Sequence, residues 1–144
     1  MGFFSDLFCA PKPRPVVIIR NVLGEEIDRV PARDLYNLDL RGKQWMHADL
    51  SGVSLFDANL EGANLFGARL YRTDFQKATL RGAELGFSYA TGASFRGSDM
   101  RGCSLYRAEI GLSRQHSSAD FTDSLVDEAT DIPERKVFGE RRLS

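Results

Sequence analysis

The sequence predicts an all-β solenoid in which the chain winds as a square coil. Three observations predict it: large apolar residues recur every five positions, small residues recur two positions before them, and glycine recurs two positions after them. A period of five fits neither an α-helix, which repeats at about 3.6 residues, nor a plain strand, which repeats at every second residue. A very short strand followed by a turn accounts for all three features.

Counted from Arg33, residues 33–112 form sixteen consecutive blocks of five. The third residue is apolar in every block, the first is small in thirteen, and the fifth is glycine in eight. Glycine suits a turn with a positive φ at its third position, as in a type II turn. If each turn bends the chain by a right angle, four blocks close one coil, and coils stack at a spacing of about 4.8 Å. The third column then fills the core, with members that include Leu50, Leu55, Leu60, Leu65, Leu70, Phe75, Leu80, Leu85, Phe95 and Leu105.

The blocks ADLSG, ANLEG, ANLFG and ADFTD follow the pattern A-(D/N)-L-x-x and resemble the pentapeptide-repeat family. The resemblance covers residues 33–131 and implies a right-handed quadrilateral β-helix, a solenoid of about four to five coils. The first coil departs from the pattern, because Arg33, Leu38 and Lys43 stand in the small-residue column and Trp45 stands in the central column. Larger residues are expected in a terminal coil, which must close its own core.

One irregularity is expected near the C-terminal end of the repeat. After Ile110, the next block of the pattern places Phe121 eleven residues later rather than ten. We therefore predict a one-residue insertion, carried by a loop at residues 113–118, after which the coil resumes through Val126.

Both ends of the chain carry segments outside the repeat. Residues 16–32 predict two short strands around a turn at Gly24, which cover the edge of the N-terminal coil. Residues 1–15 join an apolar tail to a Pro-rich spacer, and this tail either folds back over the open end of the core or docks on a partner. Residues 132–144 are predicted as a tail or a short C-terminal helix beginning near Pro133, and a homodimer formed through it is one alternative.

The composition is that of a globular protein without a membrane-spanning segment. Hydrophobic residues make up 42% and charged residues 27% of the chain, as in an ordinary globular protein. No apolar run reaches the roughly 20 residues that span a bilayer, and the first residues lack the pattern of a secretory signal. We therefore expect a cytoplasmic protein with no membrane association.

No motif indicates catalysis. The two cysteines and two histidines lack the spacing of a zinc site, and the glycines are assigned to the turn column or to the tails rather than to a phosphate-binding loop. Ser113, His116 and Asp120 are the residue types of a nucleophile triad, but they share one segment without a nucleophile elbow or an oxyanion hole. We therefore predict that the protein is not an enzyme and holds no cofactor and no metal.

The exposed fourth column is the most informative surface. Blocks four apart stack on one face, so their fourth residues form rows. One row runs Arg41, Glu61, Arg81 and Arg101, with opposite charges adjacent in its first three layers, as expected of a solvated face. Another face gathers aromatic side chains, which mark binding patches unless they lie flat over the backbone of the corner. Together with the apolar tail, the candidate protein-contact residues are Phe3, Phe4, Leu7, Phe8, Met46, Phe66, Tyr71, Phe87, Tyr89 and Tyr106.

We therefore predict a non-catalytic, rigid module that binds a protein partner or forms part of a larger assembly, docked through its termini and its aromatic face. The family resemblance supplies an alternative, because pentapeptide-repeat proteins of the quinolone-resistance type resemble DNA and act on DNA gyrase. That mechanism needs an acidic rod. The net charge here is −1, and residues 33–126 contain eleven acidic and eleven basic residues, so no direct binding of nucleic acid is expected.

Overall fold

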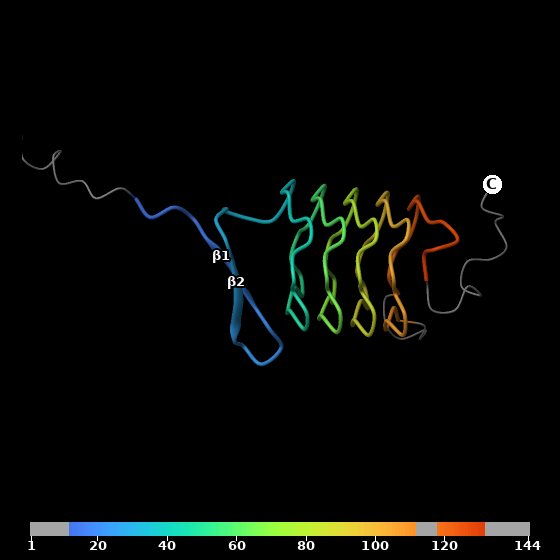
Figure 1. The fold of residues 1–144 in the computed structure, drawn as a ribbon, viewed down its shortest axis with the longest axis horizontal. Coiled ribbons are helices and arrows are strands. Elements are labelled where there is room, and N and C mark those ends of the chain that lie inside the picture. Colours follow the sequence, from blue (N-terminus) through green and yellow to red (C-terminus); the bar gives the residue numbers. More distant parts are fainter. Residues whose placement is uncertain (1–11, 112–117, 132–144) are drawn as a thin grey trace, which may run out of the picture.

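The computed structural model describes residues 12–111 and 118–131 and consists of a hairpin followed by a stack of coils (Figure 1). Strands β1 (Val17–Arg20) and β2 (Glu26–Val30) pair antiparallel, with Val17 opposite Val30. These are the two strands expected in residues 16–32, and Gly24 lies in their turn with a φ of 83°. The described residues contain no helix, and the C-terminal helix predicted at residues 132–144 lies outside them.

The coils are held together by single parallel bridges between neighbouring layers. Asp39 pairs with Asn59, and the same spacing of twenty residues is kept through the bridge from Tyr89 to Glu109. Every bridging residue in this run stands in the second column of its block. The register of five residues and four blocks per coil is therefore the one expected from the sequence.

The second column also explains the preference of the pattern for aspartate and asparagine. The Asn59 side-chain oxygen accepts a hydrogen bond from the Glu61 N–H at 3.1 Å, and the Asp74 carboxylate accepts one from the Gln76 N–H at 2.9 Å. A short polar side chain thus satisfies the backbone donor two positions later, at the turn. The pattern visible in the sequence has this local cause.

The corners of the coil have a left-handed backbone whether or not glycine is present. Every fifth-column residue from Asn37 to Arg107 has a positive φ, and Phe87 adopts 55°. A residue with a side chain costs about 1–2 kcal/mol in this conformation, so the stacked layers impose the corner on the chain. Glycine in this column relieves that strain.

The third column forms the core along the axis of the stack. The structure buries all ten central residues named above, each with at most 1% of its surface exposed, together with Trp45. On one face Phe75, Phe95 and Phe121 stack with ring centroids 5.0 and 4.9 Å apart and nearly parallel planes. The alanines of the first column are buried beside them and leave room for these large side chains.

The predicted one-residue insertion is wrong. Ser94 pairs with Asp120, a separation of 26 residues where the regular bridges span twenty, so six residues are inserted. The expected insertion of one residue places Phe121 two blocks after Ile110. In the structure the block of Phe121 is the next one after that of Ile110, and Phe121 stacks directly on Phe95. Of the predicted loop at 113–118, residues 113–117 lie outside the described residues.

The hairpin covers the first coil. The Asp49 N–H donates to the Arg20 carbonyl at 2.8 Å, and the Val22 N–H donates to the His47 carbonyl at 2.9 Å. Ile19 of β1 is buried in the core cluster at this end of the stack. The hairpin therefore shields the open edge and the core of the terminal coil.

Two of the first-coil residues that break the repeat, Lys43 and Trp45, contact β2. The Trp45 indole N–H donates to the Asp28 carboxylate at 2.7 Å, and the Lys43 ammonium contacts the same oxygen at 2.8 Å. Burial raises the pKa of Asp28, but the hydrogen bonds from Lys43, Trp45 and the Arg29 N–H outweigh it, so the pKa lies below its usual value. Lys43 and Trp45 thus join the cap to the coil.

We expect Asp28→Ala to lower the free energy of unfolding by about 1–3 kcal/mol near neutral pH, because the buried Trp45 N–H loses its acceptor. Since the folded-state pKa of Asp28 is lowered, its ionic contribution is complete above the usual value of 3.8 and is lost as the pH falls through the folded-state pKa. Urea unfolding at neutral and at acid pH should show the difference from the unsubstituted protein shrinking in acid. The exposed Asp34→Ala is the control, and an equal loss in both variants would contradict the role of Asp28.

Candidate functional site

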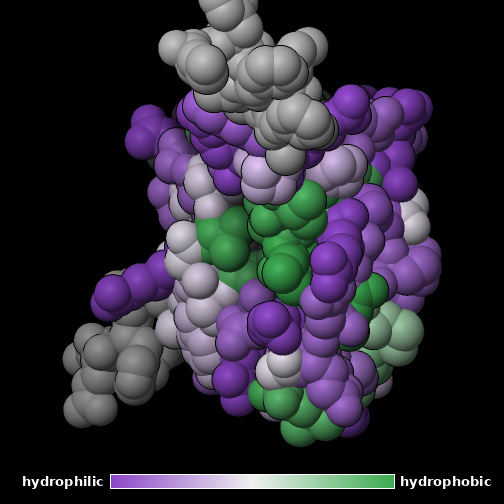
Figure 2. Space-filling view, turned by 90° about the vertical axis from the view of Figure 1, so that its left-hand side faces the viewer, coloured by the Kyte–Doolittle hydropathy of each residue, from purple (hydrophilic) through white to green (hydrophobic). Residues whose placement is uncertain are grey.

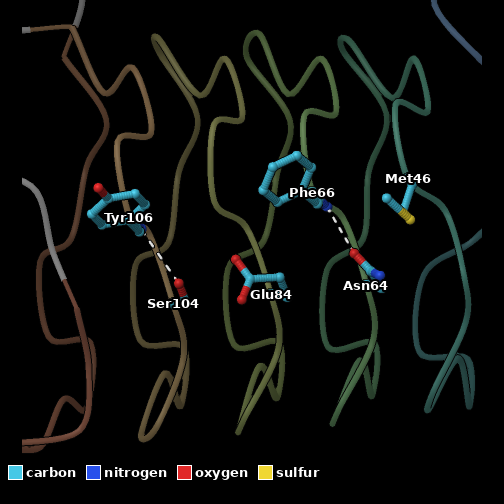
Figure 3. Close-up of a pocket in the computed structure, with 6 residues that line it drawn as sticks. All are labelled: Met46, Asn64, Phe66, Glu84, Ser104 and Tyr106. Atoms are coloured by element: carbon cyan, nitrogen blue, oxygen red, sulfur yellow. Dashed lines mark hydrogen bonds between the residues drawn. The ribbon is translucent and has the colours of Figure 1, made fainter.

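The candidate site is the face built by the blocks at 43–47, 63–67, 83–87 and 103–107. Their fourth column places Met46, Phe66, Gly86 and Tyr106 in one row, each on its own layer. Figure 3 shows Met46 and Phe66 on neighbouring coils and Tyr106 two coils beyond Phe66, with Asn64, Glu84 and Ser104 of the second column beside them. We call this row with its neighbours the aromatic face.

The rings of this face touch one another. Phe66 and Phe87 lie with centroids 5.3 Å apart, Phe87 and Tyr106 lie 5.7 Å apart, and His47 meets the edge of Phe66 at 6.2 Å. Phe87 remains 42% and Tyr106 51% exposed. The left-handed corner at Phe87 turns its ring into the gap between the other two layers, so the strip is continuous.

Other predicted contact residues lie elsewhere. Tyr71 and Tyr89 stack at 6.2 Å on the neighbouring face and are 40% and 43% exposed. The four residues of the apolar tail, Phe3, Phe4, Leu7 and Phe8, lie outside the described residues. The structure therefore gathers four predicted contact residues on the aromatic face and two on the next.

A groove of about 450 Å³ runs along the aromatic face and is lined by Met46, Asn64, Phe66, Glu84, Ser104 and Tyr106. It exists because Gly86 supplies no side chain between the layers of Phe66 and Tyr106. A Cβ on Gly86 would lie 3.4 Å from the Phe66 ring and 2.5 Å from Oε1 of Glu84. The assignment of all glycines to turns or tails is therefore wrong, because Gly86 stands in the fourth column without a positive φ.

Glu84 is the charged residue of the groove lining, and the sequence reasoning did not single it out. Its Oε1 accepts a hydrogen bond from the Gly86 N–H at 2.7 Å. Among the described residues Glu84 forms no salt bridge, whereas Asp39, Asp49 and Asp99 each pair with an arginine. A glycine in the fourth column, which Gly86 shares with Gly111, is the sequence signal at this position.

A guanidinium already lies against the aromatic face. The Arg107 side chain is 5.5 Å from the centroid of Tyr106 and 5.9 Å from that of Phe87, both within the range of cation–π attraction. These rings thus bind a planar cation within the chain itself.

The charged row on another face is neutralised locally. Arg41 pairs with Asp39 and Arg101 pairs with Asp99, each at 2.6 Å. The hydrogen bonds from Arg41 lower the pKa of Asp39 to about 2, so this carboxylate stays ionised. No continuous acidic strip forms along this row.

Of the three residues considered for a nucleophile triad, Asp120 belongs to the described part of the chain. Ser113 and His116 lie outside the described residues, while the Asp120 carboxylate accepts hydrogen bonds from Thr122. The Cys103 thiol is buried, and desolvation together with the charge of Glu84 raises its pKa to about 12. Within residues 12–111 and 118–131, no group of three His, Cys, Asp or Glu side chains converges to hold a metal.

The end of the stack that carries the hairpin is a second exposed apolar surface. Figure 2 faces this end and shows hydrophobic residues gathered near its centre. Val16, Ile18 and Ile27 are each more than a third exposed on the hairpin. In the part of the chain that the structure describes, no helix is long and apolar enough to cross a membrane.

Comparison with solved structures places this fold among known solenoids. The pentapeptide repeat protein Rfr23 of the cyanobacterium Cyanothece 51142 is 22% identical with a TM-score of 0.64, over 80% of this chain and 78% of that one. HetL, a pentapeptide repeat protein involved in heterocyst differentiation regulation in the cyanobacterium Nostoc, is 29% identical with a TM-score of 0.55. That match covers 60% of this chain but 38% of HetL. These likenesses show the right-handed β-helix.

QnrB1, a plasmid-mediated fluoroquinolone resistance protein, is 19% identical over 66% of this chain and 58% of that one, and its TM-score of 0.32 is too low to carry an argument. A search of curated proteins gave no significant match. The model of the pentapeptide repeats matches residues 34–70, 46–82 and 68–107, which together span more than half of the chain. The chain therefore belongs to the pentapeptide-repeat family.

Proposed function

We propose that the protein is a non-catalytic, rigid module that binds a protein partner along its aromatic face. The observation that carries the proposal is the continuous strip of Phe66, Phe87 and Tyr106 beside an open groove. Contiguous exposed aromatic side chains are unusual on the surface of a monomer and are typical of interfaces.

The physical properties of the face support this role. Burying a fully exposed aromatic ring contributes about 1.5–3 kcal/mol. Phe87 and Tyr106 are about half exposed and Phe66 is half-buried, so each ring supplies a part of that amount, and together they form the core of an interface. The rings stand on layers joined by backbone hydrogen bonds, and those donated by the N–H groups of Leu65, Gly67 and Leu85 are 2.7–2.9 Å long. A preorganised surface loses little conformational entropy on binding.

Phe87→Gly separates binding from folding. The variant removes the central ring of the strip and also relieves the left-handed backbone at this corner, where glycine is favoured. We expect the melting temperature to change little, because the relieved strain offsets the lost ring contacts, while partner capture on the immobilised protein falls at least tenfold. Quantitative mass spectrometry of captured proteins, with melting followed by circular dichroism, provides the measurement.

Lys77→Gly is the matched control, because it makes the same backbone change at a corner with φ of 58° on a different face. Proteins captured by the unsubstituted protein and by Lys77→Gly, but not by Phe87→Gly, are partners of the aromatic face. Identical capture by all three would overturn the proposal. Docking through the termini stays a prediction, because residues 1–11 and 132–144 lie outside the described residues.

The quinolone-resistance alternative gains no support from the surface. The Asp39–Arg41 and Asp99–Arg101 pairs neutralise the row that a DNA mimic would need to be acidic. Inhibition of DNA supercoiling by gyrase on addition of the purified protein would favour this alternative instead.

A further inference from the structure

We propose that the groove at Gly86 takes the side chain of an arginine from the bound partner, and that Glu84 is the carboxylate that pairs with its guanidinium. The inference rests on the proposed function, since it names the chemistry that the aromatic face recognises.

The first argument concerns the ion pair between a second-column carboxylate and a fourth-column arginine, which two other blocks form and block 83–87 lacks. In two blocks the second-column carboxylate binds the guanidinium of the fourth-column arginine of the same block. In both blocks the arginine Nη2 donates to one carboxylate oxygen at 2.6 Å and Nε donates to the other at 2.8 Å. In block 83–87 the second column is Glu84 and the fourth is Gly86, so the carboxylate is present and the arginine is missing. Block 108–112 has the same arrangement in Glu109 and Gly111, but Glu84 is the one that lines the groove.

The second argument is the position of the Glu84 carboxylate. Oε1 is fixed by the Gly86 N–H at 2.7 Å, and Oε2 has no hydrogen-bond partner among the described residues. Oε1 lies 2.5 Å from the point where a Cβ on Gly86 would stand, so the carboxylate occupies the place of the missing side chain. Figure 3 shows Glu84 between the layers of Phe66 and Tyr106.

The third argument is the shape and composition of the walls. Phe66 and Tyr106 flank Gly86 one layer away on either side, so their layers are roughly 9.6 Å apart. The ring of the corner residue Phe87 contacts both of these rings, and the groove lies beside it, over Glu84. The other lining residues, Met46, Asn64 and Ser104, are uncharged. An acidic group between aromatic walls attracts a cation that is planar and weakly hydrated, and this describes a guanidinium better than an ammonium.

Arg107 shows that these rings accept a guanidinium. It lies over Tyr106 and Phe87 from the corner side but makes no salt bridge with Glu84. The carboxylate therefore stays available for an arginine supplied from outside the chain, which would form the bidentate contact seen in the complete blocks.

The test uses the full chain, labelled with ¹⁵N, and the blocked peptide acetyl-Gly-Arg-Gly-amide as the probe. Titration is followed through the amide of Gly86, which donates to Glu84. We expect saturable shifts with the arginine peptide, and binding about tenfold weaker for the peptide with citrulline, which has the same shape without the charge. The lysine peptide should bind more weakly than arginine, because an ammonium cannot make two parallel hydrogen bonds to one carboxylate.

Glu84→Gln should lower the affinity for the arginine peptide about tenfold, because the variant keeps the size of the side chain and removes its charge. Glu109→Gln is the matched control, because it removes the same charge from an exposed second-column position on the neighbouring face, and it should change binding less than twofold. Gly86→Ala should abolish binding, since the added Cβ displaces the carboxylate. Equal affinity for arginine and citrulline, or equal effects of Glu84→Gln and Glu109→Gln, would overturn the proposal.

Partner capture by the Glu84→Gln and Phe87→Gly variants distinguishes failure of this inference from failure of the proposed function. If Glu84→Gln keeps full partner capture while Phe87→Gly loses it, the aromatic face binds a partner but not through an arginine. If no partner depends on Phe87, the proposed function fails and the inference fails with it.

Discussion

Leu65→Asp is expected to unfold the solenoid. Leu65 stands in the central column with no exposed surface, surrounded by the core residues of the layers on either side. An unpaired charge in such a position costs several kcal/mol, which is comparable with the 5–15 kcal/mol that stabilises a typical domain. Far-UV circular dichroism of the purified variant should show the loss of β structure at room temperature.

The control for this substitution is Glu61→Lys, four residues earlier in the chain. Glu61 is exposed in the fourth column, so reversing its charge should change the free energy of unfolding by no more than about 0.5 kcal/mol. Both substitutions change the charge of a side chain, but Leu65→Asp alters the buried third column and Glu61→Lys alters the exposed fourth column. Similar melting temperatures for the two would contradict the five-residue register.

Phe95→Ala should have the next largest effect. Phe95 is the middle ring of the Phe75–Phe95–Phe121 stack and has no exposed surface. Its loss leaves a cavity of aromatic size in the core and removes two ring contacts at once, for an expected cost of about 3–5 kcal/mol. The midpoint of urea unfolding, with an unchanged dependence on denaturant, measures this cost.

Phe56→Ala provides the comparison, because Phe56 is a half-buried fourth-column phenylalanine outside the core. We expect Phe56→Ala to lower the free energy of unfolding by about 1 kcal/mol. If Phe95→Ala cost no more than Phe56→Ala, the aromatic stack would contribute nothing beyond surface contacts. Because Phe121 follows the insertion, Phe95 also joins the regular coils to the last described part of the stack.

The core could be predicted from the sequence because every block carries the same information. Leu65 is one of sixteen third-column residues, and each neighbouring block fixes the register again, so a single irregular residue such as Ala90 does not obscure it. The two N-terminal strands were also predictable, since their β-branched residues stand on either side of a glycine turn.

The groove and the insertion could not be predicted in the same way. The groove depends on the absence of a side chain at Gly86 and on neighbours twenty residues away, which meet only after the layers are aligned. The length of the insertion depends on whether Phe121 lies one block or two blocks after Ile110. The composition of the segment between them is compatible with either number of blocks. The partner of Trp45 was missed because Asp28 lies in a different element, seventeen residues earlier.

The constant spacing of the bridges also determines how the chain can assemble itself. Each regular bridge closes a segment of twenty residues, whether it belongs to the first coil or to a later one. The entropy lost in closing a loop depends on its length alone, so adding a coil meets the same kinetic barrier at every stage of growth. Lengthening one segment from twenty to 26 residues adds about 0.2 kcal/mol to that barrier, so the six-residue insertion scarcely slows the closing of the layer that follows.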